Sequence, residues 1–295
     1  MSKRGTLYEI RRKMQVIAQT IFSYETMTKI YYYIIFKRKI NLETPKYFNE
    51  KIHWLKLNYY PYNTDVIRAT DKYEVREYLE EKNLSKYTNE LYGVWNSWNE
   101  VEWDSLPQSF ALKCTHGARN NIIVDDKDKF DENEVGEQIT RWLKEDFSLY
   151  NAEVHYSKIK PRIICEKFLD GNMTDYKFFC FHGEPKFFYI ASGFGDGEEE
   201  KMSFFNLDGT RAGFRRPYYP ELSNTEVDIP EKLDEMIEIS KLLSKDFPFV
   251  RVDLFSLKGK IYFSELTFTP SGGLMKMEPV EVHKMWGDYL NLEKL

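Results

Sequence analysis

Residues 249–267 constrain the fold more than any other part of the sequence. Two runs rich in β-branched and aromatic residues, 249–256 and 260–267, flank Leu257-Lys258-Gly259. A three-residue loop that ends in glycine, which adopts positive φ easily, is typical of a β-hairpin. Such a loop pairs Arg251 with Glu265 and makes Asp253 the diagonal neighbour of Glu265.

Side chains alternate along a strand, so this hairpin has one polar and one apolar face. The polar face is expected to carry Arg251, Asp253, Glu265 and Thr267. The apolar face is expected to carry Val250, Val252, Leu254, Tyr262 and Leu266. Neutralising either acid should therefore leave the apolar face packed, at little cost in stability.

The polar face has two possible roles. It could be an ordinary surface ion pair, or it could bind Mg²⁺, which prefers one or two carboxylates together with substrate phosphates. The loop that follows, Thr269-Pro-Ser-Gly-Gly273, is rich in small residues and would let a ligand approach the backbone. The presence of this loop favours a metal site over a surface ion pair.

The pattern R-x-D-x11-E-x-T followed by T-P-S-G-G resembles the C-terminal signature of ATP-grasp enzymes, which include D-alanine–D-alanine ligase. The resemblance implies that Arg251, Asp253 and Glu265 hold the metals and the reacting phosphate. Thr267 stands where the superfamily usually has asparagine, and a hydroxyl is a weaker metal ligand. The form E-L-T-F-T-P-x-G-G, with D-K-x-x-V-R-x-Y at 71–78, resembles the TupA-like branch, found among genes for bacterial surface polysaccharides.

Residues 110–124 form the second motif, with two short strands expected around the loop 115–121. The loop contains Gly117, and its backbone N–H groups could surround a phosphate. A polar hairpin turn beside a surface lysine is the alternative. The ATP-grasp resemblance implies that Lys113, just before the loop, contacts the ATP phosphates.

The segment 162–171 resembles the hinge between the two lobes of ATP-grasp enzymes, although a buried strand that ends in a turn has the same pattern. The resemblance implies that Glu166, Lys167 and Leu169 line the nucleotide site. A hairpin follows at 174–189. On the same resemblance, Asp175 holds the ribose and Lys177 makes a second contact with phosphate.

Two other motifs suggest sites that we do not favour. Gly193-Phe-Gly-Asp-Gly197 lacks the strand and helix context of a dinucleotide-binding loop and precedes three glutamates, so we interpret it as a flexible loop. Asp126-Lys-Asp128 has the D-x-D form of a glycosyltransferase metal site, but it lies in a charged run typical of a solvated turn.

Cysteine, histidine and hydropathy restrict the class of protein further. The three cysteines, Cys114, Cys165 and Cys180, lack metal-like spacing and are expected to be reduced and buried. The five histidines are scattered, so we expect no zinc site. No apolar run reaches transmembrane length and no signal peptide is evident, which predicts a cytoplasmic protein.

The charge is uneven along the chain. Residues 1–40 contain nine Lys or Arg and two Glu, a net charge of +7, whereas the whole chain has −5 and the remaining residues therefore −12. Apolar residues recur in this basic arm near helical spacing. The arm could contact a partner or an anionic membrane, such as the inner face of the cell membrane, or it could pack on the body.

Together these patterns predict an α+β protein with the ATP-grasp fold, in which two lobes clamp ATP. The expected parts are the arm (1–40), a mainly helical region (41–105), a lid lobe (106–169) and a metal-binding lobe (170–295). A helix at 231–247 should cover the apolar face of the 249–267 hairpin.

The resemblance implies an ATP- and Mg²⁺-dependent carboxylate–amine ligase that forms an amide through an acyl phosphate. The carboxylate is expected to be a uronic acid or another carboxylate, and the nucleophile an amino acid or small amine. A glycosyltransferase of the same polysaccharides and a non-catalytic nucleotide-binding scaffold are the alternatives. Nucleic-acid binding is not expected from an acidic body.

Overall fold

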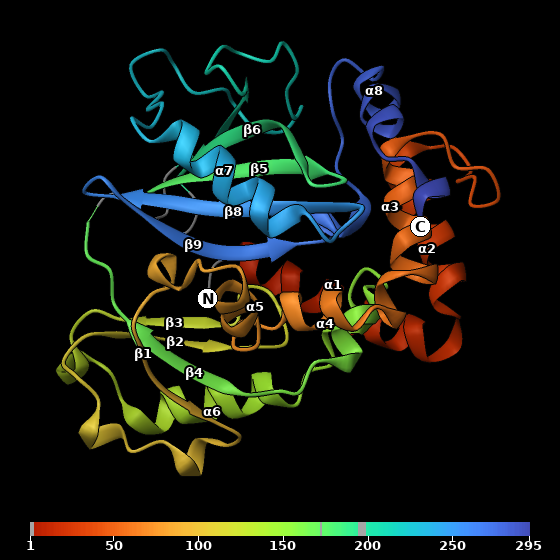
Figure 1. Ribbon diagram of the computed structural model, residues 1–295. Helices are drawn as coiled ribbons and strands as arrows, with labels where there is room; N and C mark the ends of the chain where they lie inside the picture. Colours follow the sequence, from red (N-terminus) through yellow and green to blue (C-terminus); the bar gives the residue numbers. More distant parts are fainter. Residues whose placement is uncertain (1–2, 172, 194–198) are drawn as a thin grey trace.

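The computed structural model describes residues 3–171, 173–193 and 199–295. Most of the loop predicted at Gly193–Gly197 lies outside these residues. Two antiparallel sheets lie one above the other, with helices between them and along one side (Figure 1). The α+β class predicted from the sequence is confirmed.

The upper sheet has five strands in the order β7 (Lys201–Asn206), β6 (Glu184–Ser192), β5 (Thr174–Phe181), β8 (Phe249–Leu257) and β9 (Lys260–Thr267). Helix α7 (Leu233–Ser244) crosses it (Figure 1). This helix buries Met236, Ile239 and Leu243 in the same core as Val250 and Leu254, which confirms the predicted cover. Leu242, which was also expected among the apolar positions of this helix, lies at the edge of the buried face and is 44% exposed.

The hairpin register differs from the prediction. Lys258 and Gly259, at φ 52° and 73°, form a two-residue turn that pairs Leu257 with Lys260. Two successive positive φ values are typical of the turn that best matches strand twist. A bulge at Ser264 then shifts the register, so Asp253 lies directly opposite Glu265.

The bulge decides which side chains share a face. Without it, Asp253 would lie opposite Ser264, and Glu265 would point into the apolar core. The two-residue turn also moves Tyr262 from the predicted apolar face to the polar one. Its ring stacks on Phe255, with ring centres 5.2 Å apart.

The lower sheet has four strands in the order β1 (Leu91–Trp95), β4 (Ile163–Lys167), β2 (Phe110–Cys114) and β3 (Asn121–Val124). Helix α6 (Glu132–Leu143) packs beneath it (Figure 1). Strand β1 lies before the predicted lid boundary at residue 106, so the lid sheet draws on the region expected to be mainly helical.

The other helices connect the sheets. Helices α4 (Thr64–Thr70) and α5 (Val75–Glu81) lie between them, and α3 (Phe48–Asn58) and α8 (Val282–Tyr289) cover one end of the upper sheet (Figure 1). There Trp286 stacks on Phe187, with ring centres 4.5 Å apart. Short 3-10 turns occur at Tyr60–Tyr62, Ser85–Tyr87, Trp98–Glu100, Trp103–Ser105, Lys127–Lys129, Phe147–Leu149, Val154–Lys158, Pro270–Gly273 and Leu292–Lys294.

The N-terminal arm forms two helices, α1 (Lys3–Ile21) and α2 (Tyr24–Phe36). Met27 and Tyr32 of α2 are buried, and the ring of Tyr32 lies 5.8 Å from that of His53 on α3. The arm is therefore docked on the body through α2. The three cysteines are buried and free, as predicted.

Candidate active site

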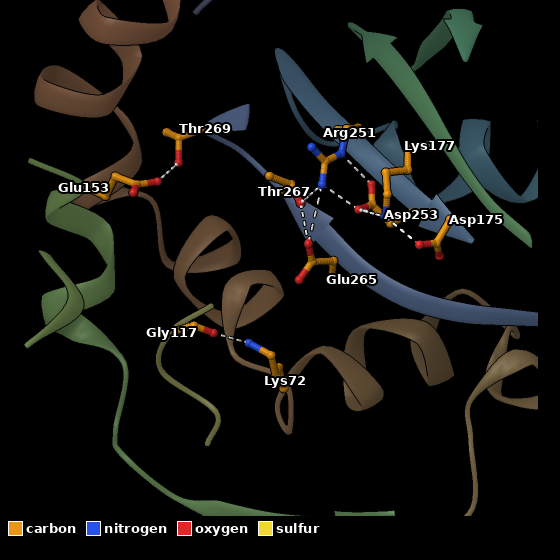
Figure 2. Close-up of polar contacts among 10 residues, drawn as sticks. All are labelled: Lys72, Gly117, Glu153, Asp175, Lys177, Arg251, Asp253, Glu265, Thr267 and Thr269. Carbon is orange, nitrogen blue, oxygen red and sulfur yellow. Dashed lines mark hydrogen bonds and ion pairs between the residues drawn. The ribbon is translucent and has the colours of Figure 1, made fainter. Parts of the chain in front are cut away.

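A row of charged side chains crosses three adjacent strands of the upper sheet. Lys177 on β5 pairs in register with Asp253 on β8, and Asp253 pairs with Glu265 on β9. Cross-strand partners point to the same side of a sheet. The alternation of strand residues therefore brings together side chains that are far apart in the sequence, as Figure 2 shows.

Asp253 is the centre of this row and is fully buried. Its carboxylate accepts hydrogen bonds from Nε and Nη2 of Arg251, at 2.6 and 2.5 Å, and from Nζ of Lys177, at 3.0 Å. Lys177 also lies 3.6 Å from the carboxylate of Asp175. The predicted residues Asp175, Lys177, Arg251 and Asp253 thus form one network.

Burial and charge act in opposite directions on these groups. Burial disfavours the charge on Lys177, but Asp253 and Asp175 outweigh it and raise the pKa of this lysine. Burial likewise opposes the charge on Arg251, and Asp253 again raises the pKa overall. Burial raises the pKa of Asp175, and Lys177 only partly offsets it. Both cations are therefore held charged, which suits them to bind an anion.

Glu265 and Thr267 form the more open side of the site. The side chain of Glu265 is 39% exposed. Its Oε1 accepts from the hydroxyl of Thr267, at 3.0 Å, and lies 3.5 Å from Nη2 of Arg251. Arg251 in turn donates to the Thr267 hydroxyl, at 2.9 Å. Thr267, predicted as a metal ligand, thus bridges the arginine and the glutamate and fixes both head groups.

Lys72 also reaches this site, and we did not predict it. Its Nζ donates to the carbonyl of Gly117, and its backbone N–H donates to Thr115, so one residue holds the glycine loop at two points. Figure 2 shows it on the side of Glu265 that faces the loop. Burial works to raise the pKa of Glu265, but Lys72, followed by Arg251 and Lys177, outweighs it and lowers the pKa.

The motif D-K-x-x-V-R-x-Y at 71–78 could have identified Lys72, but its chemistry is visible only in three dimensions. Asp71 accepts a 2.7 Å hydrogen bond from Arg162, and Arg76 lies 3.1 Å from Glu166. All three charged residues of the motif therefore contact the lid, and they fix the α4–α5 region between the sheets.

The predicted phosphate lysine and hinge glutamate contact each other. Lys113 on β2 donates to Glu166 on β4, at 2.6 Å. Glu166 is buried, and its two carboxylate oxygens accept hydrogen bonds from Lys113 and Arg76. Gly117 packs closely on Phe147, and an added Cβ would lie 2.9 Å from that ring. This contact is why the loop needs glycine.

Lys167 and Leu169 follow at the end of β4. The Lys167 side chain is 52% exposed and pairs with Glu90 at 3.3 Å. Its backbone N–H donates to Glu90, at 2.9 Å, and its carbonyl accepts from Asn89, at 2.8 Å. A carbonyl oxygen has a second lone pair, so it can accept one more hydrogen bond. Leu169 is half-buried beside it.

The loop 269–273 is held from beneath by α3. Asn49 donates to the carbonyls of Gly273 and Met275, at 2.8 and 2.9 Å, and the buried Lys56 donates to Gly272, at 3.1 Å. Ser271, Gly272 and Gly273 all have positive φ, from 53° to 83°. The loop backbone is therefore fixed in a left-handed conformation that favours glycine at two of these three positions.

The oxygen atoms of this site are too few to bind Mg²⁺ without further ligands from a bound substrate. Within residues 3–171, 173–193 and 199–295, no three acidic, histidine or cysteine side chains gather to hold a metal. Glu265 is open to solvent, whereas both oxygens of Asp253 accept from cations. Asp253, Glu265 and Thr267 would hold a Mg²⁺ ion only if phosphates and water supplied its remaining ligands.

Comparison with known families agrees with this geometry. The family described as TupA-like ATPgrasp matches residues 50–291. The chain belongs to the TupA-like ATP-grasp family. The ATP-grasp fold predicted from the hairpin motif is thus confirmed. The match includes every predicted site residue, from Lys113 to Thr267, and also Lys72.

Solved structures with a similar fold share little sequence with this chain. A D-alanine–D-alanine ligase from Bacillus anthracis is 17% identical with a TM-score of 0.41, over 68% of this chain and 57% of that one. An L-amino acid ligase from Bacillus licheniformis is 15% identical with a TM-score of 0.45, over 72% of this chain and 46% of that one. A search of curated proteins gave no match.

Proposed function

We propose that this ATP-grasp protein is an ATP- and Mg²⁺-dependent carboxylate–amine ligase of surface-polysaccharide biosynthesis. The observation that carries the proposal is the charged row on the upper sheet. Lys177, Asp253 and Glu265 lie side by side on three strands, with Arg251 hydrogen-bonded to the central acid. Lys72 approaches from the opposite side with the glycine loop. Positively and negatively charged side chains that alternate in this way can bind a phosphate group and a metal ion together.

The proposal assigns a part of the substrate complex to each predicted site residue. Lys113 and Lys177 bind the phosphates of ATP, and Lys72 adds a third ammonium from the loop side. Asp175 binds the ribose, and the chain at Glu166, Lys167 and Leu169 contacts the base. Mg²⁺ held by Asp253 and Glu265 would neutralise charge that develops on the transferred phosphate.

Arg251 is the residue best fixed for transition-state stabilisation. Two hydrogen bonds to Asp253 and one to Thr267 hold its guanidinium in place. Preorganised donors of this kind stabilise developing negative charge without having to reorient. We assign Arg251 to the oxyanion that forms at the acyl carbon and to the phosphate that leaves.

The proposed reaction has two steps. A carboxylate oxygen of the acceptor attacks the γ-phosphorus of ATP, which releases ADP and leaves an acyl phosphate. The amine then attacks the acyl carbon, the C–O bond to phosphate breaks, and a proton is released from nitrogen. The net products are an amide, ADP and inorganic phosphate.

We further propose a uronic acid as the carboxylate and an amino acid or small amine as the nucleophile, in the cytoplasm where ATP is made. The support is the resemblance to proteins from surface-polysaccharide genes. The loop at 269–273 is held by α3 and follows β9 directly after Thr267, and we propose that its backbone groups position the acceptor carboxylate.

The glycosyltransferase alternative loses its main support in this structure. Asp126 caps a 3-10 turn, accepts from Gln108 at 3.0 Å and pairs with Lys129 at 3.0 Å. Its carboxylate is therefore part of a surface turn and not of a metal pair with Asp128.

The test is ADP release and amide formation, measured by coupled assay and mass spectrometry with a panel of uronic acids and amines. Lys113→Ala should weaken ATP binding in calorimetry while the protein stays folded. ATP binding without turnover on any pair would favour a scaffold. Sugar transfer from a nucleotide sugar without use of ATP would refute the ligase proposal.

A further inference from the structure

Helix α1 has the reverse of the usual polarity of a surface helix. Along residues 10–21, where the side chains of α1 are described, the buried side chains are Arg12, Gln15 and Gln19, which are all polar. Four large aliphatic side chains in this part of the helix face outward: Ile10, Met14, Ile17 and Ile21 are 50–69% exposed, whereas Val16 is half-buried. The spacing of four, three and four residues places these four on a single stripe along the helix.

Specific contacts set this orientation of α1. Arg12 pairs with Glu145 at 3.0 Å, and its guanidinium lies 3.9 Å from the centre of the Tyr150 ring. Gln15 donates to the side chain of Asn151, at 3.0 Å. These contacts hold the polar side against residues 145–151. The apolar stripe must therefore point away from the body.

Exposed apolar residues are concentrated in the arm. Among the described residues, eight of the seventeen exposed large hydrophobic side chains lie between residues 10 and 34. The four that follow the α1 stripe are Phe22, Ile30, Tyr33 and Ile34. A surface of this kind marks a site of contact with a partner or a membrane.

The charge of the arm indicates which kind of partner covers the exposed stripe of α1. Residues 1–40 have a net charge of +7, and the remaining residues have −12. Arg11 and Lys13 are exposed beside the α1 stripe, and Lys29 and Lys37 are exposed on α2. If two copies of the chain met through α1, two strongly basic arms would lie together, which is unfavourable. An anionic lipid surface would instead neutralise the arm and repel the acidic body, which orients the protein.

We propose that α1 docks the protein on an anionic lipid bilayer, with Ile10, Met14, Ile17 and Ile21 inserted at the boundary between head groups and acyl chains. Basic helices with one apolar face bind membranes in this way, lying in the plane of the interface. Among the described residues, no helix has both the length and the apolar character needed to cross a membrane. This contact goes beyond the proposed ligase activity and does not depend on it.

The test is co-flotation of the full chain with vesicles of phosphatidylcholine alone or with about 30% phosphatidylglycerol. The wild type should float with the anionic vesicles only, and about 0.5 M NaCl should weaken the binding. The double variant Met14→Gln/Ile17→Gln should bind about tenfold or more weakly, because it loses apolar area that would enter the bilayer. Since both side chains are exposed, it should melt like the wild type.

The matched control is Leu242→Gln/Val280→Gln, which changes two exposed apolar side chains (44% and 63%) outside the arm. It should bind vesicles like the wild type. Equal binding by the stripe variant and the wild type would refute the proposal. So would a wild type that binds no anionic vesicles but changes its oligomeric state when the stripe is altered, since the stripe would then be a protein interface.

Discussion

Neutralising the two acids of the charged row should have unequal effects on stability. Asp253 is fully buried and accepts three hydrogen bonds from Arg251 and Lys177. Glu265 is 39% exposed, and the nearest Arg251 nitrogen is 3.5 Å away. From the sequence we expected little cost for either change, because the apolar face of the hairpin would stay packed. Burial of Asp253 overturns that expectation for one of them.

The magnitude follows from what remains around the cations. Removing one partner of a buried ion pair costs about 3–5 kcal/mol. In Asp253→Asn, Arg251 retains Glu265 and Lys177 retains Asp175 at 3.6 Å. We therefore expect the lower end, about 3 kcal/mol, or a fall of about 6 °C in Tm for a chain of this size. Glu265→Gln should cost less than about 1 kcal/mol.

The assay combines urea unfolding, followed by circular dichroism, with ADP release in the presence of Mg²⁺. Both variants should lose most of the activity, and only Asp253→Asn should lose stability. The control is Asp288→Asn, which breaks a surface pair with Lys284 at 2.8 Å, where both side chains are more than 60% exposed. An Asp253→Asn protein as stable as this control would refute the buried network, and full activity in both site variants would refute the active site.

Three further predictions test other parts of the site. Lys72→Met should lower kcat/KM for ATP about 10- to 100-fold, because a charged donor to phosphate is lost, whereas Lys86→Met, 69% exposed, should not; equal kinetics in the two variants would count against Lys72. Gly273→Ala should destabilise by about 1–3 kcal/mol in thermal unfolding, since φ is +83° and the new Cβ would lie 3.0 Å from the buried His53 ring. Gly259→Ala, at φ +73° with nothing within 4 Å, should cost less, and an equal loss would show that the contact with His53 is unimportant. Burial lowers the pKa of Lys56 to about 7, against about 10.4 in an unfolded chain. Between about pH 7 and 10.4, Lys56 is therefore protonated in the unfolded state and largely neutral in the folded state. The free energy of unfolding should rise with pH over this range, and Lys56→Met should flatten that rise in urea titrations.

Local features of this protein could be predicted from its amino-acid sequence alone. Alternation along 249–267 and two short runs around Gly117 were enough to predict the strands. The motif from Arg251 to Gly273 was enough to predict the ATP-grasp fold by resemblance, because its residues are close in the sequence, on one hairpin and the loop that follows it. The burial of the three cysteines was predicted from their number and spacing, and helix α7 from the helical period of its apolar residues.

The tertiary structure decided what local patterns leave open. The bulge at Ser264 set the face of Glu265, and only the packed sheet fixes such a shift of one residue. Lys72 reaches Gly117 across 45 positions of the chain, and Lys177 reaches Asp253 across 76. No spacing rule connects residues so distant, because their approach depends on how the strands are ordered in the sheet.

The arm shows the same division. Its sequence gave the charge and the apolar period of α1, which are properties of one helix. Which side of that helix meets the body was decided by Arg12 and Gln15, which bind residues 145–151. An amphipathic pattern predicts which residues share a stripe, but the partner surface determines whether that stripe is buried, and here it is the polar side that the body covers.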